Sequence, residues 1–157
     1  MTDQFKEIPS TDPVSDVIRT AFDISIPVEG GWGYSIETAL KLMPPLPAPL
    51  TQVEFTLASM RTHIEMNMTL PEDQRYGGIS LNELSRDKYL KEHKSFDVVT
   101  YEITAMKESD YAEFIEEYKE GYEKEDFDIT AHFEARKAAS IKRKITLCFD
   151  ITETEGK

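Results

Sequence analysis

The residue types best suited to a binding site gather at positions 29–35, which read Glu-Gly-Gly-Trp-Gly-Tyr-Ser. Three of the seven glycines and the only tryptophan of the chain lie in this loop. Glycine permits positive φ angles and close backbone approach, so the loop can fold tightly and hold two aromatic rings against another surface. The candidate ligand-binding residues of the loop are Glu29, Gly30, Gly31, Trp32, Gly33 and Tyr34. The same features also fit a structural turn, and for Trp32 we favour burial at the end of the core.

Two His-x-Glu pairs raise the question of a metal site. His63 with Glu65, and His132 with Glu134, would each aim both side chains at one face of a strand. On a helix the same spacing sends the side chains apart, and isolated histidines usually serve as surface or hydrogen-bonded residues. Because Cys148 is the only cysteine, neither a cysteine zinc cage nor an internal disulfide can form. We therefore predict no metal and no cofactor, and we keep His63 as a further candidate ligand contact.

The sequence carries none of the common catalytic or nucleotide-binding signatures. It lacks G-x-x-x-x-G-K, G-x-G-x-x-G, H-E-x-x-H and G-x-S-x-G. Its many carboxylates offer acid–base groups, but no pattern indicates which of them is shielded from water, and that shielding is what raises a carboxyl pKa toward neutrality. Glu29 is the least arbitrary choice because it borders the glycine loop. Whether the protein is an enzyme is left open by the sequence.

The net charge restricts the partners of this protein. Thirty acidic residues against eighteen basic residues give a formal charge of −12. Such a surface is repelled by phosphate backbones and by anionic lipids, so we expect no nucleic-acid partner and no membrane partner. No run of about eighteen apolar residues occurs that could span a bilayer. The first residues do not read as a secretory signal and a single cysteine forms no disulfide framework, so we expect a cytoplasmic location.

Acidic and basic residues separate in the second half of the chain. Positions 108–128 hold ten acids and two lysines, whereas positions 131–144 hold one acid and five basic residues. The two segments either face one another or form solvated helix faces. The second interpretation is the usual meaning of such charge runs.

Hydrophobic periodicity predicts an α+β fold. Apolar and polar residues alternate in the strands that we expect at 18–28, 52–60, 97–106 and 144–152. Apolar stripes and capping signals predict helices at 109–124 and 129–143. The predicted fold is a mostly antiparallel sheet of about four or five strands, with these two helices packed on one face.

Two segments fit both a helix and a strand. At 35–43, Ser35 would cap a short helix, but a glycine-rich loop favours a returning strand and therefore a hairpin. At 52–68, Thr51 and Glu54 would form a helix-capping box, whereas alternating apolar residues favour a strand with an irregular middle. We predict a hairpin for the first segment and a strand for the second, because the sheet needs additional strands.

The domain organisation and the function follow from these features. Residues 1–16 are expected to form a flexible arm, residues 17–152 a single domain, and residues 153–157 a polar tail. We expect a non-enzymatic, acidic, cytoplasmic module that binds a protein partner or a small molecule, and a homo-oligomer is compatible with the sequence. The alternative is a small-molecule-binding protein or enzyme with its pocket at the 29–35 loop.

Overall fold

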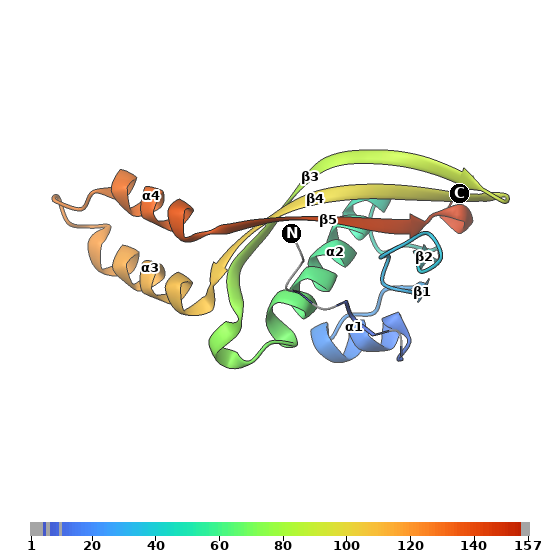
Figure 1. Ribbon diagram of the computed structural model, residues 1–157, viewed down its shortest axis with the longest axis horizontal. Helices are drawn as coiled ribbons and strands as arrows, with labels where there is room; N and C mark the ends of the chain where they lie inside the picture. Colours follow the sequence, from blue (N-terminus) through green and yellow to red (C-terminus); the bar gives the residue numbers. More distant parts are fainter. Residues whose placement is uncertain (1–4, 6, 10, 155–157) are drawn as a thin grey trace.

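The computed structural model describes residues 5, 7–9 and 11–154, and the strands of this part form one mixed sheet (Figure 1). The strands are β1 (Val28–Gly30), β2 (Leu40–Leu42), β3 (Tyr76–Lys91), β4 (Lys94–Lys107) and β5 (Ile141–Asp150). Their order across the sheet is β1-β2-β5-β4-β3. β2 runs parallel to β5, whereas the other neighbouring pairs are antiparallel. The predicted α+β class is confirmed, and the mostly antiparallel sheet is corrected to a mixed one.

The helices connect the strands in a way that explains the parallel pair. They are α1 (Val14–Phe22), α2 (Leu50–His63), α3 (Glu108–Gly121) and α4 (Ile129–Ala139). α2 continues into a π-helical turn at Ile64–Met68, and 3₁₀ turns lie at Glu72–Gln74 and Thr152–Thr154. The chain between β2 and its parallel neighbour β5 runs through α2, β3, β4, α3 and α4, and parallel neighbours require such a long connection. None of the helices in the described residues is long and apolar enough to cross a membrane.

Several predicted elements are confirmed, with shifted boundaries. β4 contains the strand predicted at 97–106, and β5 corresponds to the strand predicted at 144–152. α3 corresponds to the helix predicted at 109–124. The helix predicted at 129–143 ends at Ala139, because β5 begins at Ile141 and pairs with β4. The hairpin predicted around 35–43 is confirmed, since β1 and β2 pair antiparallel.

The strand predicted at 18–28 is wrong. Most of α1 occupies this range, and its buried residues Val14 and Ile18 follow helical spacing. Asp23 ends the helix in the left-handed conformation with a φ of 56°. Ile24, which belonged to the predicted alternation, is 47% exposed, and only Ile26 and Val28 at its end are buried. The boundary expected at residue 16 falls inside α1, and residues 1–4, 6, 10 and 155–157 of the expected arm and tail lie outside the described part.

The strand predicted at 52–60 is also wrong, because α2 occupies that range. Val53, Leu57 and Met60 line up at helical spacing and pack into the core. Phe55 is 41% exposed and lies in an edge-to-face arrangement with the ring of Tyr101, with 6.0 Å between ring centroids. The local pattern of apolar residues fits both a helix and a strand, and burial against the sheet stabilises the helix.

The core lies between one face of the sheet and the helices α1 and α2, which Figure 1 shows below the long strands. Val99, Tyr101 and Leu147 point into this core and are fully buried. On the other face, Thr100 and Thr146 hydrogen-bond across the strands near solvent. α3 and α4 lie beyond the end of the sheet in Figure 1, where they connect β4 to β5. The prediction that these two helices cover one face is therefore not confirmed.

Candidate functional site

The glycine loop folds as a turn that carries Trp32 into the core. Trp32 is 1% exposed, and its Nε1 has no hydrogen-bond partner among the described residues. Gly33 has a φ of 85°, its N–H donates to the Thr38 carbonyl at 2.7 Å, and a Cβ at this position would lie 3.0 Å from the Cys148 carbonyl oxygen. Gly30 (φ 82°) and Gly31 likewise lie too close to neighbouring backbone for a side chain. The glycines thus shape a turn around a buried indole.

The remaining candidates lie in three different surroundings. Glu29 is exposed on β1. Tyr34 is partly buried and joins a buried ion cluster described below. His63 lies at the end of α2 and lines an apolar groove of about 400 Å³ with Phe22, Phe55, Thr56, Ser59 and Met60. Burial lowers the pKa of His63. The structure therefore does not gather Glu29, Trp32 and His63 around one cavity among those of the described residues.

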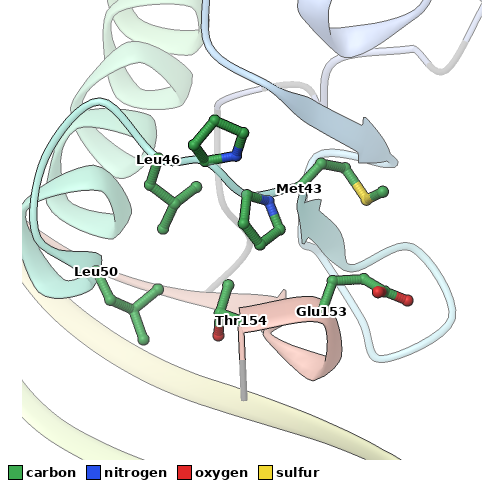
Figure 2. Close-up of a pocket in the computed structure, with 7 residues that line it drawn as sticks. Met43, Leu46, Leu50, Glu153 and Thr154 are labelled. Atoms are coloured by element: carbon green, nitrogen blue, oxygen red, sulfur yellow. The ribbon is translucent and has the colours of Figure 1, made fainter. Parts of the chain in front are cut away.

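A second groove lies next to the proline-rich connection between β2 and α2 (Figure 2). Its volume is about 660 Å³, and it is lined by Met43, Pro44, Pro45, Leu46, Leu50, Glu153 and Thr154. In Figure 2 the carboxylate of Glu153 extends away from Leu46 and Leu50. The lining therefore offers apolar contact and a single ionisable group, which is too little for acid–base or nucleophilic chemistry.

The buried ion cluster (Tyr34, Arg61, Glu65 and Arg143) joins the glycine loop to α2 and β5. Glu65 is 1% exposed, accepts a hydrogen bond from the Tyr34 hydroxyl, and pairs with Nη1 of Arg143 at 2.7 Å. Arg61 donates to the carbonyls of Trp32 and Thr146, each at 3.2 Å, and its guanidinium lies over the Tyr34 ring. Burial, with the bond to Glu65, raises the pKa of Tyr34 above its ordinary range. The cluster locks the loop, α2 and β5 together.

A separate set of carboxylates lies at the other end of α2. Glu54 is 0% exposed, and Arg86 reaches it at 2.6 Å and Asp97 at 3.3 Å. Burial, together with the neighbouring Asp97 carboxylate, raises the pKa of Glu54 to about 8 against the opposing effect of Arg86. Because Glu54 is closed off from solvent, it has no path to a substrate, and we assign it to the scaffold.

The helical hairpin (α3, α4 and the loop between them) has a different character, because its core is very small. Only Gly121 and His132 are buried among its residues. Tyr118 lies at its centre, with its ring within 5.6–6.2 Å of the rings of Tyr122, Phe127, His132 and Phe133. At the base, Tyr111 packs against Gly78 of β3, where a Cβ would collide with its ring. The hairpin is therefore anchored at one end and held together by aromatic contacts.

His132 is the polar element of this aromatic centre. It is 3% exposed, and its Nδ1 lies 2.9 Å from the Glu117 carboxylate. The rings of Phe114, Phe127 and Phe133 lie within 5.2–5.8 Å of the imidazole. Its Nε2 is buried without a hydrogen-bond partner among the described residues. His132 thus fixes α4 against α3, and it leaves Glu117 as an exposed carboxylate beside the buried ring.

One side of the hairpin is hollow and acidic. The acidic hollow has a volume of about 470 Å³ and is lined by Glu117, Glu120, Gly121, Lys124, Asp126, Phe127, Asp128, Ala131, His132 and Ala135. Asp128 also caps α4 by accepting a hydrogen bond from the Ala131 N–H at 3.0 Å. Gly121 leaves room for Phe127, since a Cβ would lie 2.5 Å from its ring. Four carboxylates, one ammonium group and an aromatic ring therefore border one cavity.

Apolar side chains are exposed on the same hairpin. Tyr122 is 56% exposed, Ile129 46% and Phe133 48%. Ile129 and Phe133 are four residues apart on α4 and therefore share a face. Tyr118 touches both Tyr122 and Phe133, which makes these rings neighbours. These residues form an aromatic face (Tyr118, Tyr122, Ile129 and Phe133), and its Tyr118 ring also contacts Phe127 and His132, which line the acidic hollow. The hairpin projects from the end of the sheet in Figure 1.

Sequence reasoning found part of this arrangement. The acidic run at 108–128 and the aromatic stripe of α3 were visible, but His132 was considered as a metal ligand beside Glu134 or as a surface or hydrogen-bonded residue, not as the buried centre of an aromatic cluster. The aromatic residues on both sides of His132 were the available signal for a buried ring. No group of three or more metal-ligating side chains occurs within the described residues.

A scan against models of known protein families finds no match, and searches of curated proteins and of solved structures find none either. The function is therefore argued from geometry and charge.

Proposed function

We propose that this protein is a cytoplasmic, non-enzymatic interaction module whose helical hairpin binds a basic segment of a partner protein. The observation that carries the proposal is the acidic hollow beside exposed aromatic rings on a projecting element. Each part of that observation has a physical consequence for the partner.

The hollow favours a cationic side chain. Glu117, Glu120, Asp126 and Asp128 border it, and a lysine or arginine placed there would meet carboxylates on several sides. Phe127 adds an aromatic face, which also attracts a cation. Lys124 is the one positive group of the lining and lies on the loop between the helices. An anionic or neutral ligand would leave these carboxylates without compensation.

The aromatic face supplies the apolar part of the contact. Exposed Tyr, Phe and Ile side chains in one patch are typical of binding energy concentrated in a few anchor residues. A basic segment that is also amphipathic would place apolar residues here and a charged residue in the hollow. The fold favours this use, since a hairpin anchored at its base can bind without disturbing the sheet.

Peptide binding with matched charge variants tests the proposal. The probe is a fluorescently labelled amphipathic peptide of alternating lysine and leucine, followed by anisotropy. In the hairpin variant E117Q/E120Q/D126N/D128N we expect at least about tenfold weaker binding, because four carboxylates are removed while side-chain shape and the α4 cap are kept. Binding to the wild type should weaken with added salt.

The control variant E29Q/E37Q/E72Q/D73N removes the same charge from exposed positions outside the hairpin. We expect it to bind within about twofold of the wild type, since long-range charge effects are screened at moderate salt. Equal losses in the two variants would show that only net charge matters and would refute the proposed site.

A further inference from the structure

Described residues of the N-terminal segment lie against the buried ion cluster and place there the kinds of group that a ligand would carry. The Phe5 ring lies over the Arg143 guanidinium, with 4.5 Å from Cζ to the ring centroid. Its edge packs on the Tyr76 ring at a centroid distance of 5.5 Å. The backbone N–H of Ile8 donates to the Tyr34 hydroxyl at 2.9 Å. The N-terminal strap (Phe5, Glu7 and Ile8) therefore contributes both a stacked ring and polar contacts.

Glu7 brings a carboxylate toward the same cluster. Burial lowers the pKa of Arg61, while Glu65, and more weakly Glu7, raise it. Glu7 itself is exposed. An aromatic ring on one arginine and a carboxylate near the other are the two features of an aromatic acid.

Two arginines lie beneath the strap, in a protein whose formal net charge is −12. Arg61 and Arg143 share the single carboxylate of Glu65. Nε of Arg61 is buried and has no hydrogen-bond partner among the described residues, since Glu65 lies 3.5 Å away. An acceptor is therefore missing at one point of an otherwise well-connected cluster.

Free space adjoins the Phe5 ring. A hollow of about 120 Å³ is lined by Phe5, Leu70, Gln74, Tyr76 and Lys107. The Lys107 ammonium lies 4.6 Å from the centroid of the Tyr76 ring and adds a second kind of cation to this surface. A ring system larger than that of Phe5 would occupy the place of Phe5 together with this hollow.

We propose that the strap occupies the binding site of a small organic anion that carries an aromatic ring. The ring of the ligand replaces Phe5 on the planar guanidinium of Arg143 and against Tyr76. Its carboxylate takes the place of the Glu7 carboxylate on the side of Arg61, where it supplies the missing acceptor. The strap acts as an intramolecular competitor, so its removal raises the apparent affinity of the site.

Calorimetric titration of the full chain with 2-naphthoate tests this site. The variant F5A/E7Q removes the ring and the carboxylate of the strap and keeps the rest of the chain. We expect it to bind one naphthoate with at least about tenfold higher affinity than the wild type. Adding R143K should reverse most of this gain, because lysine keeps the charge but lacks the planar stacking group. The neutral probe 2-naphthalenemethanol should not bind.

The matched control D87N/Y89A makes similar changes at exposed positions of β3, outside both proposed sites, and should behave as the wild type. The near-UV circular dichroism of buried Trp32 reports whether each variant is folded. If F5A/E7Q lost that signal, F5L/E7Q would replace it with the same expectation, since leucine keeps an apolar cover. Equal naphthoate affinity in the wild type and the folded strap variant, or equal binding of the neutral probe, would overturn the proposal.

Discussion

The body of the protein has a large buried core, whereas its helical hairpin has a very small one. In the body, α2 and the sheet enclose a contiguous set of buried apolar side chains, together with buried ion pairs. In the hairpin, Gly121 and His132 are the buried residues, and aromatic rings remain in solvent. Stability should therefore reside in the body, while the hairpin supplies a surface for recognition.

The largest expected difference concerns aromatic residues in the two regions. Trp32→Ala should lower the free energy of unfolding by about 3–5 kcal/mol, because it leaves a large cavity in the core. Phe133→Ala, on the exposed face of α4, should cost less than about 1 kcal/mol. Urea denaturation of both variants gives the comparison. Similar midpoints for the two would contradict the division between body and hairpin.

Neutralising a carboxylate should also destabilise the protein more in the body than in the hairpin. Glu65→Gln should cost about 3 kcal/mol, since it leaves Arg61 and Arg143 without their shared counter-charge inside the protein. Glu117→Gln should cost less than about 1 kcal/mol, because Glu117 is 57% exposed and glutamine can still bond to His132. Urea midpoints near neutral pH measure both, and a large loss for Glu117→Gln would argue that the hairpin is part of the scaffold.

The pH dependence of stability should originate in the body. The pKa of Glu54 is raised to about 8 in the folded state, so the folded protein holds this proton more tightly than the unfolded chain does. The contribution is fully present below the ordinary glutamate pKa and is lost as pH rises through about 8. The free energy of unfolding should fall by on the order of 2 kcal/mol between pH 5 and 9.

Glu54→Gln should remove most of that decline, as urea midpoints across the pH range would show. Glu83→Gln is the control. The hydrogen bond to Arg86 lowers the pKa of Glu83, so the contribution of Glu83 to stability changes only at acidic pH. A decline of equal size in Glu54→Gln and the wild type would assign the effect to other groups.

The sequence was most informative where one period dominates. The alternation in β4 and β5 and the stripe of α3 predicted these elements, because the pattern is local and long. At α2 both periods fitted, and the burial of Leu57 and Ala58 against the sheet decided between them. Propensity and pattern cannot anticipate such tertiary contacts.

Buried charges were the least predictable feature of the molecule. Glu54 was noted only as part of a possible capping box and Glu65 only beside His63, yet both are shielded from solvent. Arg143, which belongs to the basic run at 131–144, lies on β5 and pairs with buried Glu65. Apart from Arg61, one helical turn before Glu65, their partners lie on strands and loops far away in sequence, so no local pattern marks the burial of these carboxylates. The loop at 29–35 was recognised as unusual, and the burial of Trp32 gives it a structural role.

The central claim is that the hairpin recognises a basic segment while the body stays unchanged, and chemical-shift mapping tests it most directly. Backbone amide spectra of the full chain are recorded with increasing amounts of the lysine–leucine peptide. We predict saturable shifts confined to α3, α4 and their loop, centred on the residues of the acidic hollow. Shifts that centre on the sheet, on the 29–35 loop or on the groove of Figure 2, or no saturable shifts at all, would contradict the account.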